Sequence, residues 1–122
     1  MSKYKKTGYQ AAFENAYKGI RIVLKSEKNF RFHFIIALIV LACGVLFDFD
    51  AAEMAILVLT ISIVLICEMV NSAIEFTLDA VYKNKYSQLV GMAKDIAAGA
   101  VMLSALSSIV IGIFLFGGKI LS

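Results

Sequence analysis

The chain has 122 residues, of which 61% are hydrophobic and only 17% are charged. A soluble domain usually carries about 45–50% apolar and about 25% charged residues, so this composition indicates an integral membrane protein. The net charge of +3 is too small an excess for a nucleic-acid-binding protein. The lack of proline and the eight glycines argue against disordered and turn-rich β structure. We therefore expect one all-α membrane domain covering residues 1–122.

The first predicted element is an amphipathic helix over about residues 8–28. Its apolar and polar side chains fall on opposite faces, with Phe13, Ala16, Tyr17, Ile20, Val23 and Leu24 on one and Gln10, Glu14, Lys18, Arg21 and Lys25 on the other. This pattern is typical of a helix that lies on the inner membrane surface and is attracted by anionic lipids. It equally fits a helix packed on the protein's own inner surface, and the sequence does not choose between them.

Three membrane-spanning helices follow, over about residues 30–47, 52–81 and 89–117. Stretches 32–47, 54–67 and 96–118 contain no Asp, Glu, Lys or Arg. A membrane helix needs roughly 20 mainly apolar residues, so all three segments qualify. Eight of the twelve basic residues precede the first span, and three lie between the second and the third. The positive-inside rule then predicts a cytoplasmic N-terminus and an extracytoplasmic C-terminus.

A polar stripe interrupts the second membrane helix. Glu68, Asn71, Ser72, Glu75 and Asp79 are spaced i, i+3, i+4, i+7 and i+11, so they share one face of a helix. A carboxylate at mid-membrane costs roughly 2.5–3.5 kcal/mol on insertion scales, which makes a set without a function an expensive feature. The spacing therefore predicts a binding or catalytic surface that faces protein and not lipid.

The depth of this stripe indicates the kind of chemistry. If the helix begins near residue 52 at the outer surface, Glu68 lies about 24 Å along its axis. The hydrocarbon core is about 30 Å thick, so Glu68 is expected just inside its cytoplasmic edge. Glu75 lies about 11 Å further along, at the interface. This placement favours a reaction between a lipid headgroup and a water-soluble substrate, although a small oligomeric proton or cation transporter remains an alternative.

Charged residues from other segments are expected at the same depth. Glu27 precedes the first span and, with Glu75, could hold a divalent cation such as Mg²⁺. Lys94 and Asp95 begin the third span, where Lys94 could neutralise a phosphate. Taken alone, Glu27 and Lys94 each fit a solvated interfacial charge better, and it is the convergence of these residues at one depth that favours a functional site. His33 is interpreted as a structural residue at the membrane boundary.

Two motifs make the sequence recognisable. Glu68-Met69-Val70-Asn71-Ser72-Ala73-Ile74-Glu75 with Asp79, followed by Ala93-Lys94-Asp95-x-Ala97-x-Gly99-Ala100-Val101, closely resembles the prokaryotic diacylglycerol kinase and undecaprenol kinase family. The resemblance runs from Gly19 through the third span. The segment Ser26-Glu27-x-Asn29-Phe30-Arg31-Phe32-His33 is more similar to the Gram-positive members, which act on undecaprenol.

The resemblance implies roles for individual residues. Glu68 matches the general base that acts on the lipid hydroxyl, and Glu27 and Glu75 match the metal-binding carboxylates. Side chains expected to bind the nucleotide or order the site are Asn71, Tyr86, Lys94 and Asp95. Ser72 and Asp79 complete the polar stripe.

The resemblance also implies a bacterial inner-membrane enzyme that forms homotrimers, with active sites between neighbouring protomers. It would transfer the γ-phosphoryl group of MgATP to a membrane lipid alcohol, with undecaprenol as the expected substrate and diacylglycerol as the alternative. The chain has no G-x-x-x-x-G-K-[ST] loop, so ATP rests on the resemblance alone.

Overall fold

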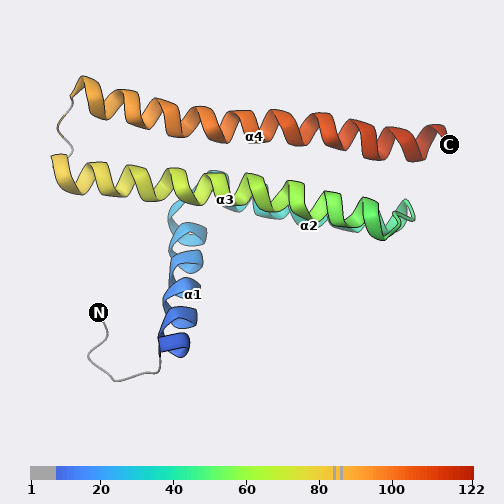
Figure 1. Cartoon of the computed structure of the whole chain (residues 1–122), viewed down its shortest axis with the longest axis horizontal. Coiled ribbons are helices and arrows are strands. Elements are labelled where there is room, and N and C mark those ends of the chain that lie inside the picture. The colour runs from blue at the N-terminus through green and yellow to red at the C-terminus, as the bar shows by residue number, and fades with distance from the viewer. Residues whose placement is uncertain (1–7, 84, 86) are drawn as a thin grey trace.

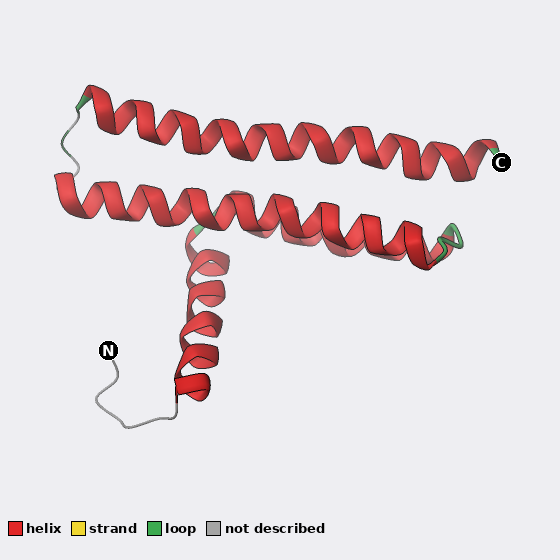
Figure 2. Ribbon diagram, viewed as in Figure 1, coloured by secondary structure: helices red, strands yellow, loops and turns green. Residues whose placement is uncertain are grey.

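The computed structural model describes residues 8–83, 85 and 87–122 as four helices joined by short loops (Figure 2). They are α1 (Gly8–Ser26), α2 (Lys28–Leu46), α3 (Ala51–Tyr82) and α4 (Gln88–Leu121). The last three are long and apolar enough to cross a membrane. The predicted all-helical architecture with three long apolar helices is thus confirmed.

The break between α1 and α2 falls at Glu27, whose backbone is extended (φ −111°, ψ 107°). Arg31 on the first turn of α2 reaches back, and its Nη1 donates to the carbonyl oxygens of Leu24 (2.9 Å) and Lys25 (2.8 Å). These bonds satisfy carbonyls that the end of α1 would otherwise leave unpaired. The axis of α1 therefore turns away, and it runs across the direction of the three long helices (Figure 1).

A tight turn joins α2 to α3 at the opposite end of the bundle. Asp48 adopts a left-handed conformation (φ 57°), which aspartate tolerates better than most residues. Asp50 and Glu53 then form a reciprocal capping box, in which each side chain accepts a hydrogen bond from the other's backbone N–H at 2.8 and 3.0 Å. The chain thereby reverses, and α3 runs antiparallel to α2.

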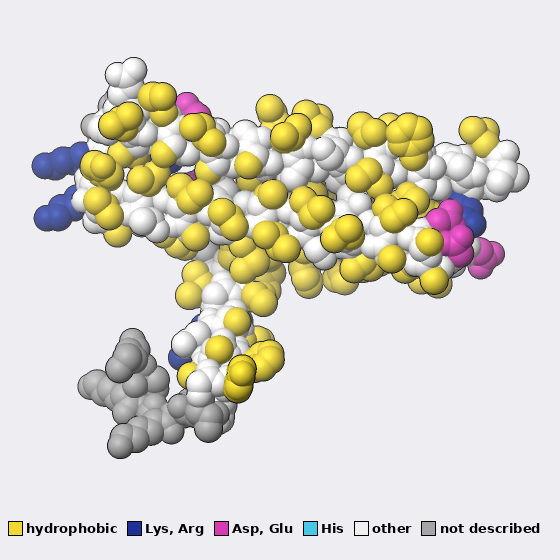
Figure 3. Space-filling view, viewed as in Figure 1, with side chains coloured by type: hydrophobic (Ala, Val, Ile, Leu, Met, Phe, Trp, Pro, Cys, Tyr) yellow, Lys and Arg dark blue, Asp and Glu magenta, His cyan; other side chains and the backbone are white. Residues whose placement is uncertain are grey.

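The long helices pack side by side with α3 in contact with both neighbours (Figure 1). Few apolar residues are buried within the single chain: Val23, Phe30, Ala37, Leu57, Val64, Val90 and Ala97. Most large apolar side chains are exposed, and Figure 3 shows them covering the visible face while charged side chains gather at the two ends of the long helices. This surface suits lipid or further protein, because soluble monomers rarely expose apolar patches beyond a few hundred Å².

Candidate active site

The polar stripe of α3 faces the protein. Glu68 and Ser72 are each only 7% exposed, whereas neighbours on the other side of the helix, such as Val70, are exposed to the surroundings. Glu68, Ser72, Asn71 and Glu75 line one pocket of about 360 Å³. Its other walls come from the junction between α1 and α2, from α2 and from α4, and comprise Glu27, Asn29, Phe30, Ala98 and Val101. Four members of the stripe and Glu27 therefore line the same pocket, whereas the fifth member, Asp79, lines another.

Glu68 is the most enclosed charged residue of this pocket. Its Oε1 lies 2.7 Å from Nδ1 of His33 on α2. Its Oε2 is buried and has no hydrogen-bond partner among the described residues. Because a buried polar atom without a partner is costly, this oxygen is ready to accept a hydrogen bond from a group that enters the pocket.

The other two carboxylates of the pocket, Glu75 and Glu27, are half-buried and thus more accessible than Glu68. Asn71 Nδ2 donates to Glu75 Oε1 at 2.9 Å and so orients that carboxylate. Asn71 Oδ1 is buried without a partner in the described part of the chain. Glu27 makes no side-chain cap on α2, and its carboxylate instead lines the pocket.

These groups fit a divalent cation that arrives with a ligand of its own. Within residues 8–83, 85 and 87–122 there is no cluster of three or more metal-ligating side chains that would hold a resident ion. Mg²⁺, however, is typically bound by one or two carboxylates together with substrate phosphates and water. Glu27 and Glu75 supply two carboxylates in one pocket, and the partnerless oxygen of Asn71 is a further potential ligand.

A second pocket, of about 390 Å³, lies nearer the loop between α3 and α4. It contains Lys94, Asp95 and Asp79, and Lys94 Nζ donates to Asp79 Oδ1 at 2.7 Å. The structure thus separates these three residues from the pocket of Glu68. Tyr86, expected near the nucleotide, lies outside the described residues.

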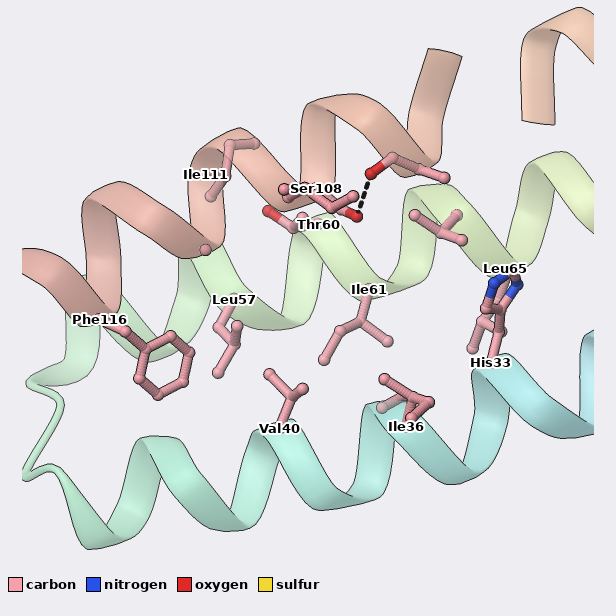
Figure 4. Close-up of a pocket in the computed structure, with 15 residues that line it drawn as sticks. His33, Ile36, Val40, Leu57, Thr60, Ile61, Leu65, Ser108, Ile111 and Phe116 are labelled. Carbon is pink, nitrogen blue, oxygen red and sulfur yellow. Dashed lines mark hydrogen bonds between the residues drawn. The ribbon is translucent and has the colours of Figure 1, made fainter. Parts of the chain in front are cut away.

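An apolar cavity of about 320 Å³ extends from His33, on the side away from the Glu68 pocket, toward the end of the bundle that holds the α2–α3 turn (Figure 4). It is enclosed by α2, α3 and α4 and ends at Phe116, and its lining side chains are almost all aliphatic. The polar residues in its lining are His33 and two hydroxyl-bearing residues, Thr60 and Ser108. Both bond backbone carbonyls of their own helices, at 2.7 and 2.6 Å. His33 consequently stands where an apolar space meets a polar one.

Sequence reasoning missed His33 as a partner of Glu68. The pairing follows from the register of the α2–α3 hairpin, which the structure shows: His33 lies eleven residues before Gly44, and Glu68 lies eleven residues after Leu57. Gly44 and Leu57 pack closely near the turn, since a methyl group added at Gly44 would lie 3.0 Å from Leu57 Cδ2. In two antiparallel helices of equal rise, equal steps from one contact lead to another.

Comparison with known proteins adds the family. Residues 14–116 match the model of the prokaryotic diacylglycerol kinases. The chain belongs to this family. The membership confirms the resemblance drawn from the motifs, and it makes the protein a membrane-bound lipid kinase that uses ATP as phosphoryl donor.

Three relatives illustrate the breadth of the family. The undecaprenol kinase of Bacillus subtilis is 38% identical over 109 residues, which cover 89% of this chain and 88% of the relative. A diacylglycerol kinase of Synechocystis is 34% identical over 83% of this chain, although the chain spans only 58% of that protein's length. The diacylglycerol kinase of Escherichia coli K12 is 30% identical over 78% of this chain and 77% of the relative. Both substrate names therefore occur among similar proteins.

Proposed function

We propose that this kinase phosphorylates undecaprenol to undecaprenyl phosphate, using MgATP at the cytoplasmic face of the bacterial inner membrane. The observation that carries the proposal is the buried Glu68, whose partnerless Oε2 lies beside a polar pocket while His33 on its other oxygen borders an apolar cavity. An oily alcohol and a nucleotide can meet at such a boundary. The choice of undecaprenol is supported by the 109-residue match to the Bacillus subtilis relative.

The proposed reaction is a direct in-line transfer. Glu68 Oε2 accepts the proton of the lipid hydroxyl while the hydroxyl oxygen of the lipid forms a bond to the γ-phosphorus. The bond between the γ-phosphorus and the bridging oxygen breaks, and ADP leaves with the electron pair. Phosphoryl transfer depends mainly on positioning and charge neutralisation, which a small set of side chains can provide.

The remaining residues of the stripe and its surroundings would hold the nucleotide. Glu27 and Glu75 would hold Mg²⁺, which when bound neutralises phosphate charge. Asn71 keeps Glu75 in place through its 2.9 Å hydrogen bond. Lys94 and Asp95 would bind or order the phosphates, and Tyr86 would lie near the base.

We further propose that α1 rests on the inner membrane surface, where anionic lipids attract its basic residues. Only Val23 of α1 is buried, while Phe13 and Tyr17 of its predicted apolar face are 77% and 63% exposed. A helix that runs across the membrane helices and exposes aromatic side chains suits the interface plane. The N-terminus is then cytoplasmic and the C-terminus extracytoplasmic, in agreement with the distribution of basic residues.

Diacylglycerol is the second candidate substrate, and phosphatidic acid would then be the product. It is favoured by the relatives from Synechocystis and Escherichia coli, whose names specify diacylglycerol kinases. The transporter alternative has no comparable support. Apart from His33, which contacts Glu68, the described residues that line the cavity beyond Glu68 are aliphatic, aromatic or hydroxyl-bearing, and none of them is an acid that would extend a proton or cation pathway.

The test is a radiolabelled-ATP assay of the purified protein in mixed micelles against a panel of lipid alcohols. We expect phosphate transfer to undecaprenol to exceed transfer to diacylglycerol. Glu68→Gln should lower turnover by about 100-fold or more, because loss of a general base typically costs 10²–10⁴-fold. Asp48→Asn, an acid-to-amide change in the α2–α3 turn, is the matched control and should retain wild-type turnover.

Several outcomes would contradict the proposal. Preference for diacylglycerol would replace the substrate, and wild-type turnover by Glu68→Gln would remove that residue from the base role. ATP consumption that ignores added lipid alcohol, together with cation flux in ATP-free liposomes, would favour the transporter.

A further inference from the structure

We propose that His33 is a positioning residue for Glu68: its imidazole fixes the carboxylate so that Oε2 is the oxygen that receives the proton of the lipid hydroxyl. This inference rests on the proposed function and assigns to the single histidine of the chain a part in the reaction. Its basis is the 2.7 Å contact between His33 Nδ1 and Glu68 Oε1.

The contact distinguishes the two oxygens of Glu68. Oε1 is engaged by the imidazole, whereas Oε2 is buried and partnerless. A carboxylate carries acceptor positions on both oxygens and can rotate about its last bond. With a donor fixed on Oε1, rotation is restricted and Oε2 keeps one direction. A reactive group held in the productive orientation gains rate that a freely rotating one loses.

The surroundings leave His33 as the side chain placed for this task. The acidic neighbours of Glu68 in its pocket are Glu27 and Glu75, and the side-chain hydrogen bond that Glu68 makes among the described residues is the one with His33. From α4, the pocket receives Ala98 and Val101, which carry no titratable group. On the cavity side, His33 is the one titratable group among the described residues of the lining, and the others there are aliphatic, aromatic or hydroxyl side chains.

His33 also separates two environments. Its imidazole borders the apolar cavity of α2, α3 and α4 (Figure 4), and its Nδ1 lies 2.7 Å from Glu68 Oε1. Glu68 is thereby shielded from the apolar side by a polar group, which reduces the cost of keeping a carboxylate at this depth. The same residue thus both stabilises the buried acid and sets its direction.

The first test is spectroscopic and needs no turnover. Because the chain has one histidine, ¹⁵N-histidine labelling of the protein in lipid nanodiscs gives a single pair of ring resonances. We expect Nδ1 to carry a proton in the wild type, as a donor to a carboxylate must. Glu68→Gln should shift the Nδ1 resonance, and Glu75→Gln, which changes an acid one pocket wall away, should leave it nearly unchanged.

The second test is kinetic. His33→Leu should lower kcat for the lipid alcohol by about 10- to 100-fold, the size expected when a reacting group is misoriented, with the KM for MgATP unchanged. His33→Asn places an amide nitrogen near the position of Nδ1 and should recover most of the lost kcat. Phe34→Leu alters the next residue of α2, whose side chain is 38% exposed, and should behave as wild type.

The outcomes separate this inference from the function on which it rests. An Nδ1 resonance that ignores Glu68→Gln would overturn the contact. Full kcat in His33→Leu, or equal losses in the Leu and Asn variants, would overturn the positioning role even if lipid phosphorylation is confirmed. The Nδ1 resonance could shift on Glu68→Gln as expected while the wild-type protein transfers no phosphate to any lipid alcohol. That result would overturn the proposed function, and the role of His33 with it, while the contact between His33 and Glu68 would stand.

Discussion

Two acids of α3 are balanced by different partners. Glu68 is buried against the imidazole of His33, and Asp79, three turns further along, accepts from the ammonium group of Lys94. The first partner is an imidazole, whose ring nitrogens can donate or accept, whereas the second is an amine that donates. The Asp79–Lys94 pair is also more open, with the two side chains 40% and 37% exposed. The two contacts therefore differ in what their loss would change.

The exposed pair should matter little for folding. Partly exposed ion pairs contribute about 0–1 kcal/mol, so Asp79→Asn is expected to lower the free energy of unfolding by less than about 1 kcal/mol. If Lys94 binds the nucleotide phosphates, Lys94→Ala should raise the KM for ATP by about 10-fold or more, since a hydrogen bond to a charged group contributes about 1.5–3 kcal/mol. Steady-state kinetics and detergent unfolding of both variants measure these effects.

Asp79→Asn serves as the control for Lys94→Ala, because it breaks the same pair and keeps the ammonium group. An unchanged KM in Lys94→Ala would argue against phosphate binding. Equal increases in both variants would mean that the intact pair, and not Lys94 alone, supports the nucleotide.

At the level of single residues, the sequence predicted which side chains of α3 share a face, because helical periodicity is a local property. The sequence also predicted that Glu27 lies near that face, because both are expected at the same depth in the membrane. It did not give His33 as the partner of Glu68, since that contact depends on the register between two helices. It also did not show that Asp79 and Lys94 pair with each other, which draws Lys94 toward the second pocket.

Among the elements, the α2–α3 hairpin depends on close packing near its turn. A methyl group added at Gly44 would lie 3.0 Å from Leu57 Cδ2 and 3.2 Å from Met54 Cε. The small residue lets the two helices approach, which is the usual role of glycine between membrane helices. A larger side chain requires the side chains of Leu57 and Met54 to move away from Gly44, which loosens the contact between α2 and α3 near the turn.

Gly44→Val should therefore destabilise the protein by about 1–3 kcal/mol, the usual cost of overpacking a tight contact. Gly117→Val on α4 is a matched control, because nothing lies within 4 Å of an added Cβ there and the change in helix propensity is the same. Thermal unfolding in one detergent compares the two. Equal losses of stability would show that propensity alone, and not the Gly44 contact, causes the effect.

The helices themselves were predictable because long apolar runs and charged boundaries are properties of composition. Their ends depended on finer chemistry. The first helix was expected to continue to residue 28, yet α1 ends at Ser26 because Arg31 satisfies its terminal carbonyls and Glu27 is extended. The last helix was expected to end near residue 117, yet α4 reaches Leu121, where Lys119 Nζ lies 2.9 Å from Glu53 Oε1.

For the whole molecule, the two separate pockets bear on assembly. One pocket contains the three acids Glu27, Glu68 and Glu75, and the other contains Lys94, which is proposed to bind the phosphates of the nucleotide. The most hydrophobic stretch of α4 contributes no buried residue to the chain. Both observations support the proposed homotrimer, in which a neighbouring protomer would cover α4 and complete a nucleotide site. A single sequence cannot show which chain supplies each group.

Subunit mixing tests this arrangement. At an ATP concentration well below the wild-type KM, we expect Glu68→Gln and Lys94→Ala each to turn over slowly alone, and protein reconstituted from a mixture of the two to exceed both, because some shared sites would then contain both intact groups. A mixture of Glu68→Gln with Glu75→Gln should regain none, since these two acids belong to one pocket of one chain. Absence of recovery in the first mixture would indicate that each protomer holds a complete site.

The length of α3 has a consequence for how the enzyme meets its membrane. Its 32 residues span about 48 Å, which exceeds the roughly 30 Å hydrocarbon layer by about 18 Å. One continuous helix thus carries both the apolar segment and the polar stripe, and no break in the helix separates them. The height of Glu68 relative to the headgroups is set by a count of residues from the capped start at Asp50. Turnover is then expected to depend on bilayer thickness, because a thicker or thinner bilayer displaces the hydroxyl group of the lipid relative to the carboxylate of Glu68.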